Sequence, residues 1–188
     1  MRNFYFLQIP LGTDAAYLPQ AVGTIWSYCN QFEEVRKKYK LAGVWWNKEI
    51  DIVEPDFIAA SCYMWNWKIT YDALKEIKKK YPKCKIVVGG PEPKYTSEWC
   101  KEHPEVDAVL AYYGEETMRR LLIDDDLNIP GVVTKDFNNA AEAEYADPKM
   151  IPSPYLNGFF DSLLKGNNQK VRAIFEGNRG CPYTCSFC

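Results

Sequence analysis

The sequence is poor in the features that mark several large protein classes. It has one histidine, His103, among 188 residues, and its charged side chains nearly cancel to a net charge of −2. A chain of this charge offers no electrostatic footprint for nucleic acid or an anionic membrane. Its N-terminal apolar run, Phe4 to Leu7, is too brief for a signal peptide or a membrane span. We therefore expect a cytoplasmic chain with neither nucleic acid nor membrane as a partner.

Phosphate-binding loops are also missing, because the sequence contains no Gly-x-Gly-x-x-Gly or Walker pattern. What it does contain is cysteine: seven in all, an odd number that fits a reducing compartment better than a disulfide framework. Four have no ligand spacing and are interpreted as ordinary buried thiols: Cys29, Cys62, Cys84 and Cys100. The other three form a pattern.

Cys181, Cys185 and Cys188 follow Cys-x-x-x-Cys-x-x-Cys spacing directly after Gly177-Asn178-Arg179-Gly180. Three close thiolates can hold three irons of a four-iron, four-sulfur (4Fe–4S) cluster, which leaves one iron open. An open iron on a reducible cluster is the arrangement that S-adenosylmethionine (SAM) uses. A structural zinc site would need a fourth ligand, and His103 lies far upstream. A ferredoxin would need a fourth cysteine, and the nearest, Cys100, lies in a different expected element.

Short apolar runs alternate with helical patterns along the first part of the chain, which predicts βα units and a doubly wound parallel sheet of the α/β class. We expect strands at 3–9, 41–45, 56–63, 85–88 and 106–112, and helices at 18–29, 67–81, 97–102 and 114–122. Ligands of such sheets gather at the carboxyl ends of the strands.

Three parts are expected. Residues 1–123 form the α/β domain, and residues 124–170, rich in Asp, Asn and Pro, form a linker with little regular structure and one small hairpin around Gly131 to Val133. Residues 171–188 begin a second domain with a strand at 171–176 and the cysteine loop.

The segment from Arg179 to Cys188 resembles the signature of radical SAM enzymes. The resemblance implies that the three cysteines hold the 4Fe–4S cluster and that Phe187, just before the last of them, packs near the SAM adenine. In such enzymes the reduced cluster cleaves SAM, and a 5′-deoxyadenosyl radical takes a hydrogen atom from the substrate.

The N-terminal part resembles the cobalamin-binding domain that precedes the barrel in one class of radical SAM enzymes. The resemblance rests on residues 55–63, 87–91, 106–109 and 114–117. It implies that Ser61, Gly89 and Gly90 contact the nucleotide tail of the corrinoid. It assigns four further residues to the same site: Tyr63, Pro91, Gly114 and Glu115. A glycine pair also lets another group approach the backbone closely.

One departure from that family concerns the cobalt. Domains that coordinate it use an Asp-x-His-x-x-Gly loop after the first strand, and Pro10 to Leu18 contains no histidine. His103 is a poor substitute, since Glu102-His103-Pro104 is typical of an exposed helix end. We expect any bound cobalamin to lack a protein histidine ligand.

Length bears on activity. A full barrel needs about 250 residues, so we expect the remaining barrel strands to lie beyond Cys188 or on a separate chain. On this interpretation the chain is the N-terminal portion of an enzyme, from a truncated or split gene or deliberately shortened. We expect no SAM cleavage by this chain alone. Members of the family often transfer a methyl group from cobalt to the substrate. The sequence does not identify the substrate. Two alternatives stay open: a non-catalytic corrinoid-binding or interaction module with vestigial cysteines, and a flavodoxin-like regulatory or nucleotide-binding domain.

Overall fold

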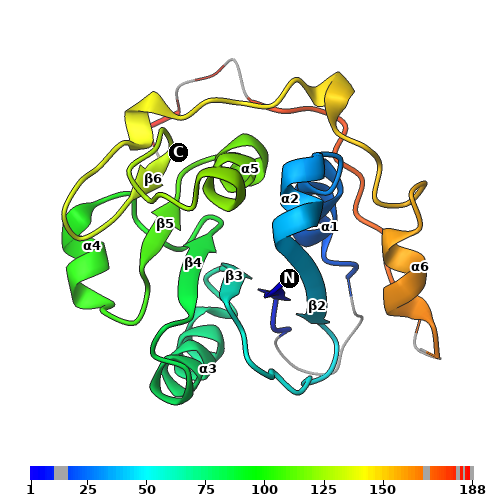
Figure 1. Cartoon of the computed structure of the whole chain (residues 1–188). Helices are drawn as coiled ribbons and strands as arrows, with labels where there is room; N and C mark the ends of the chain where they lie inside the picture. The colour runs from blue at the N-terminus through cyan, green and yellow to red at the C-terminus, as the bar shows by residue number, and fades with distance from the viewer. Residues whose placement is uncertain (11–16, 167–169, 181–182, 184, 187–188) are drawn as a thin grey trace.

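Six strands form one sheet in the order β2-β1-β3-β4-β5-β6 (Figure 1). The computed structural model describes residues 1–10, 17–166, 170–180, 183, 185 and 186. The strands are β1 (Arg2–Leu7), β2 (Tyr39–Trp45), β3 (Phe57–Ser61), β4 (Lys85–Gly89), β5 (Ala108–Leu110) and β6 (Val132–Val133). The first five are parallel and β6 is antiparallel to β5. The expected α/β class is therefore confirmed.

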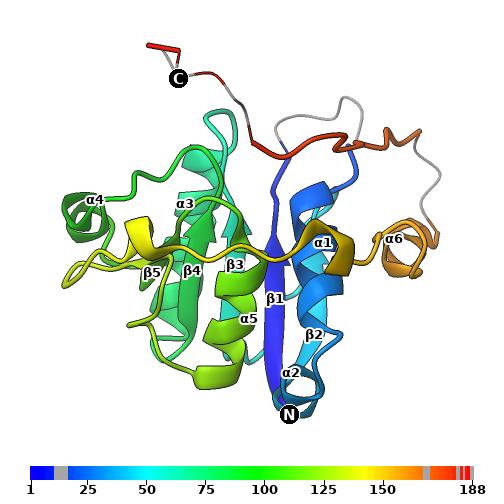
Figure 2. The same ribbon diagram turned by 90° about the horizontal axis from the view of Figure 1, so that it is seen from above.

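Helices cover both faces of this sheet (Figure 2). The elements on one face are α1 (Gln20–Cys29), α2 (Glu33–Lys38) and α5 (Gly114–Asp124). The elements on the other face are α3 (Trp67–Lys80) and α4 (Ser97–Glu102). The remaining elements are α6 (Phe159–Leu164) and two short 3₁₀ turns, η1 (Ala140–Glu142) and η2 (Pro148–Met150).

The strands are apolar on both sides because each side faces a helical layer. In β1, Phe4 and Phe6 pack toward α1 and α5, whereas Tyr5 and Leu7 pack toward α3 and α4. Successive side chains of a strand point to opposite faces, so two covered faces require a continuous apolar run. This explains why short unbroken apolar stretches marked the strands in the sequence.

The parallel strands follow the order 2-1-3-4-5 of a flavodoxin-like doubly wound sheet. In such an order the chain reverses its winding direction between β1 and β3, and the crevice outside the carboxyl ends of these two strands is where ligands bind. The topology therefore gives one preferred site at this edge.

The segment 124–170 is more closely joined to the sheet than a linker would suggest. Val132 and Val133 of β6 pair with β5, and Val133 also bridges Asn138, which gives the small hairpin expected there. Helix α6 packs on α1, where a Cβ on Gly23 would lie 2.7 Å from Phe160 Cζ. The segment thus extends the sheet and covers one of its helices.

One expected strand is not formed among the described residues. Residues 171–176 make a single parallel bridge, Arg172 with Tyr17, instead of a strand. A strand needs a continuous neighbour for its backbone hydrogen bonds, and the described part of this segment pairs only around Arg172, through the bridge to Tyr17 and the Leu18 N–H that donates to the Arg172 carbonyl. The apolar content of this segment was misleading, since Phe175 is exposed.

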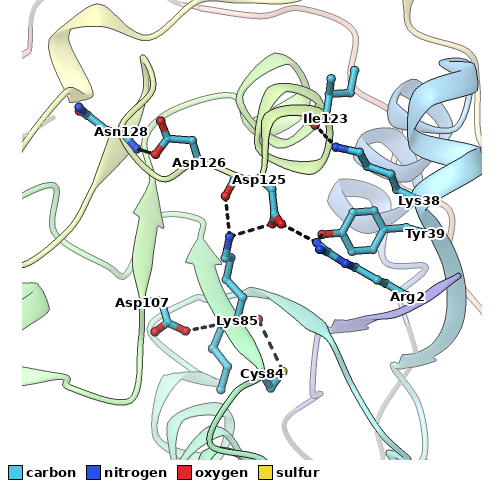
Figure 3. A network of polar contacts seen from close by, with 11 residues as sticks. Arg2, Lys38, Tyr39, Cys84, Lys85, Asp107, Ile123, Asp125, Asp126 and Asn128 are labelled. Atoms are coloured by element: carbon cyan, nitrogen blue, oxygen red, sulfur yellow. Dashed lines mark hydrogen bonds and ion pairs between the residues drawn. The ribbon is translucent and has the colours of Figure 1, made fainter.

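A polar network fastens the amino ends of the strands (Figure 3). Asp125, which ends α5 with φ of 58°, lies 2.7 Å from Arg2 Nη1 and 3.0 Å from Lys85 Nζ. Arg2 also donates to the Tyr39 hydroxyl, and Lys38 Nζ donates to the carbonyl of Ile123. Five elements, β1, β2, β4, α2 and α5, are joined here, at the end of the sheet opposite the ligand-binding edge.

Across the described ranges, no helix has the length and apolar character needed to cross a bilayer.

Candidate functional site

A pocket of about 460 Å³ lies at the carboxyl ends of the parallel strands, between the sheet and the helices α1 and α5. This volume is in the range typical of cofactor sites. Strand residues at its floor include Phe6 of β1, Ala59 of β3 and Val87 of β4. The pocket therefore occupies the β1/β3 crevice that the topology favours.

Ser61 and Gly89 lie beside each other at the floor of this pocket. They are register partners at the ends of β3 and β4, on the face that carries Ala59 and Val87. A Cβ placed on Gly89 would meet nothing closer than the carbonyl oxygen of Leu110 at 3.5 Å, an ordinary contact. The protein itself therefore has room for a Cβ atom at Gly89, which borders the pocket.

Gly90 also borders the pocket, but it is glycine for a different reason. Its φ is 102°, and a Cβ there would lie 2.4 Å from the carbonyl oxygen of Cys62. That clash arises because Cys62 N–H donates to the Gly89 carbonyl and Glu92 N–H donates to the Cys62 carbonyl. The group that approaches the Gly90 backbone is thus the chain's own β3–α3 loop.

Tyr63 and Pro91 separate in the structure. Tyr63 lines the pocket and stacks on Trp65, with ring centroids 4.6 Å apart. Pro91 is exposed and is absent from the pocket lining. Of the seven residues assigned by resemblance to the corrinoid, six line one pocket.

Gly114 and Glu115 open helix α5 at the pocket wall. A Cβ on Gly114 would lie 3.3 Å from Ile25 Cδ1, so this glycine lets α1 and α5 approach. Glu115 is only 4% exposed, and its Oε1 lies 2.7 Å from Arg179 Nη2. Its Oε2 is buried and has no hydrogen-bond partner among the described residues.

Residues 170–180 cross the carboxyl ends of the strands, where Figure 2 shows them in red. The Tyr155 hydroxyl holds this segment by donating to the Ile174 carbonyl and accepting from the Ile174 N–H. Gly180 N–H donates to the Tyr113 hydroxyl, and Arg179 lies over the Tyr113 ring at 5.0 Å. The segment that leads to the cysteine motif therefore forms one side of the pocket mouth.

Two of the three expected cluster ligands, Cys181 and Cys188, lie outside the described residues, and so does Phe187, which was expected near SAM. Cys185 is described and exposed. In the described part of the chain, no three Cys, His, Asp or Glu side chains gather as a metal site would require. The cluster ligands therefore stay a prediction from their spacing.

His103 packs far from the pocket, on the face of the sheet that α3 and α4 cover. It caps the end of α4, where its ring stacks on Trp99 at 4.0 Å and its Nδ1 lies 2.8 Å from the Trp99 carbonyl oxygen. Its side chain is half-buried rather than exposed, because Trp67 and Tyr71 also contact it edge-on. The chain's one histidine thus cannot reach a ligand in the pocket.

The four scattered cysteines are buried, as expected. Burial raises the pKa of each thiol, to about 12 for Cys84 and about 11 for Cys100, and above these values for Cys29 and Cys62. A thiol with a raised pKa stays protonated and is a poor nucleophile or metal ligand. These cysteines are core residues.

Sequence reasoning missed four residues at this site. Gln20 lines the pocket with a buried Oε1 that has no partner among the described residues. Asn66 is fully buried and joins two strand ends, since its Nδ2 donates to the carbonyls of Ile9 and Ser61. Tyr112 has φ of 56° in the loop before α5, where Tyr113 is the N-cap. Of these four, only Tyr112 and Tyr113 could have been found from the sequence, because they directly precede Gly114, which was assigned to the site.

The fit to a corrinoid nucleotide tail can be judged from these features. The pocket has an apolar floor, a glycine at which added side-chain atoms would enter it, and two buried acceptors without partners in the described structure, Gln20 Oε1 and Glu115 Oε2. A flat aromatic base with hydroxyl-bearing sugar matches apolar walls with a few acceptors. The residues present fit the group.

Comparison with known proteins gives the class of this domain. Residues 48–122, from the segment before β3 into α5, match the family model of the B12 binding domain. The chain therefore contains a B12-binding domain, on which the pocket-lining residues of β3, β4 and α5 all lie.

Three relatives narrow the class further. The chain is 32% identical over its full length to a cobalamin-dependent radical SAM methyltransferase, TokK, of Streptomyces tokunonensis, and to the 2-(S-pantetheinyl)-carbapenam-3-carboxylate methyltransferase of Streptantibioticus cattleyicolor. Over 75% of its length it is 29% identical to the hopanoid C-3 methylase of Methylococcus capsulatus. The chain spans about 30% of the length of these relatives. The matches confirm the resemblance to radical SAM proteins with a cobalamin-binding domain.

Proposed function

We propose that this chain binds a corrinoid in the pocket beneath residues 170–180 and, through Cys181, Cys185 and Cys188, a 4Fe–4S cluster. It would do so as part of a cobalamin-dependent radical SAM enzyme whose reactions include methyl transfer. The observation that carries the proposal is the pocket itself, which lies at the β1/β3 crevice and collects six of the seven residues assigned to the corrinoid by resemblance.

The pocket lining supports the tail-binding part of the proposal. Ser61 and Gly89 form the floor, Gly114 and Glu115 form the α5 wall, and Tyr63 borders the opening. The apolar floor excludes water from the aromatic base. Gly90 keeps the β3–α3 loop close to β4 and so maintains the shape of the pocket.

The cobalt would have no histidine ligand from this chain, because His103 lies on the other face of the sheet. When bound, the corrinoid supplies a cobalt that can carry a methyl group, and the cluster supplies an electron for SAM cleavage. Phe187 would pack near the SAM adenine. We further propose that residues outside these 188, in the same chain or in a separate one, complete the SAM site and choose the substrate.

The proposal is tested by titrating the chain with hydroxocobalamin and following the visible spectrum. The expected result is saturable binding in the base-off form without the signature of histidine coordination. A histidine-coordinated spectrum would contradict the placement of His103, and no binding at tens of micromolar would sink the corrinoid proposal.

Iron and sulfide uptake separates the enzyme from a non-catalytic module. Anaerobic reconstitution should load the wild-type chain with a cluster. A chain that binds cobalamin but no more iron than a variant without the three cysteines would be a corrinoid-binding module instead.

A further inference from the structure

Two carboxylates open helix α5, and their surroundings differ. Glu116 is fully engaged: Tyr28 donates to it at 2.8 Å, and Arg119 and Arg120 donate to it at 2.5 and 3.2 Å. Glu115 has only Arg179 as a side-chain partner, through Oε1, and its Oε2 is left without one among the described residues. A buried charged acceptor without a partner costs free energy unless another donor satisfies it.

Glu115 lines the pocket, whereas Glu116 does not. The lining of the same pocket contains a second buried acceptor without a partner in the described residues, Gln20 Oε1. These two acceptors, from α1 and α5, line one pocket with a largely apolar floor, and they call for a ligand that brings hydrogen-bond donors. The nucleotide tail of a corrinoid has such donors in its ribose hydroxyls, which cobinamide lacks.

The other oxygen of Glu115 reaches the cysteine motif. Arg179 stands two residues before Cys181, and it is held by Glu115 at 2.7 Å, by Glu176 at 2.9 Å and by the ring of Tyr113. Gly180 is fixed in turn by the Tyr113 hydroxyl. One carboxylate therefore borders both the pocket and the entry to the motif.

We propose, on the basis of the proposed corrinoid function, that Glu115 is shared: Oε2 accepts a hydrogen bond from the nucleotide tail, while Oε1 positions Arg179 and the entry to the cysteine motif. Tail binding and order in residues 174–180 are then coupled. Linkage makes the coupling reciprocal, so that whatever orders the segment also tightens tail binding.

The decisive comparison uses two ligands, cobalamin and cobinamide, the second of which lacks the nucleotide tail. Glu115→Gln keeps the shape of the side chain and an oxygen for Arg179, but it replaces the second oxygen with a donor. Cobalamin affinity should fall about tenfold or more, since hydrogen bonds to charged groups contribute about 1.5–3 kcal/mol. Cobinamide affinity should not change. Glu116→Gln, one residue along the same helix, is the matched control and should leave both affinities as they are.

Hydrogen exchange tests the coupling. In the wild-type chain, cobalamin should slow exchange of the amides of residues 174–180, and cobinamide should not. Arg179→Ala should remove that ligand-dependent slowing. Arg172→Ala, which loosens the same segment through its separate contact with Tyr17, should speed exchange but keep the preference for cobalamin.

The outcomes are distinct. If Glu115→Gln weakens both ligands equally, or neither, the shared role of Glu115 is wrong even though the corrinoid binds. If cobalamin leaves exchange of residues 174–180 unchanged, the coupling is wrong. If the wild-type chain binds neither ligand, the proposed function fails and this inference fails with it.

Discussion

Replacing each of the two adjacent glycines, Gly89 and Gly90, should affect different properties: stability at Gly90 and ligand binding at Gly89. At Gly90 an alanine would adopt a φ of 102° and place its Cβ 2.4 Å from the Cys62 carbonyl oxygen. A left-handed conformation alone costs an L-residue about 1–2 kcal/mol, and a backbone clash adds to that. We expect Gly90→Ala to lower the free energy of unfolding by about 3 kcal/mol, or roughly 6–12 °C in Tm for a chain of this size.

At Gly89 the backbone has no such constraint, and an added Cβ has ordinary contacts. Gly89→Ala should therefore leave stability within about 1 kcal/mol of the wild type. Gly89→Leu should fill the pocket floor beside Ser61 and weaken cobalamin binding more than tenfold, with little change for cobinamide. Thermal unfolding and visible titration of the three variants check this. A Gly90→Ala chain with unchanged Tm, or a Gly89→Leu chain that binds cobalamin normally, would refute the reasoning.

Three further predictions follow from other parts of the chain. Hydrogen bonds from Arg119 and Tyr28 outweigh burial and lower the pKa of Glu116 to about 2, so its contribution to stability is complete above about pH 4.5 and is lost as the pH falls toward 2. In urea unfolding at a series of pH values, Glu116→Gln should flatten this acid-dependent loss of stability by on the order of 1–3 kcal/mol. A variant with the same pH dependence as the wild type would contradict the prediction. Asp125→Asn should lower the free energy of unfolding by about 0.5–1 kcal/mol, and by less at high salt, because its ion pairs are partly exposed and asparagine tolerates the left-handed φ. Asp125→Ala should lower it by about 1 kcal/mol more, because alanine does not tolerate that φ. Equal losses for the two variants in calorimetry would argue against strain at this residue. Anaerobic reconstitution should give a substoichiometric, air-sensitive cluster, and Cys185→Ser should lower the amount of iron bound. The reconstituted chain should form no 5′-deoxyadenosine from SAM. Detection of that product above a cysteine-free control would overturn the expectation of inactivity.

Most strands could be predicted from the sequence, because burial on both faces of the sheet requires a continuous run of apolar residues. Residues such as Phe4 to Leu7 must be apolar throughout, and that pattern needs no knowledge of the partner strands. The ends of β3 and β4 were also predictable, since Ser61 and Gly89, which line the pocket, follow directly on such runs.

Contacts between distant segments could not be predicted in this way. Glu115 and Arg179 are 64 positions apart, and neither residue carries a local pattern that names the other. The role of Gly90 also depends on the course of the β3–α3 loop, which brings the Cys62 carbonyl against it. The strand expected at 171–176 was wrong for a similar reason, since a strand depends on a continuous partner, which composition does not give, and this segment has only the bridge to Tyr17.

Strand β6 has a consequence for aggregation. β5 is only three residues long, and without Val132 and Val133 its outer backbone groups would form an open edge that could pair with another molecule. A chain cut at Asp124 would keep every parallel strand and the pocket floor, yet it would lose this protection. The residues that follow α5 therefore cover an edge of the sheet, whatever they contribute to binding.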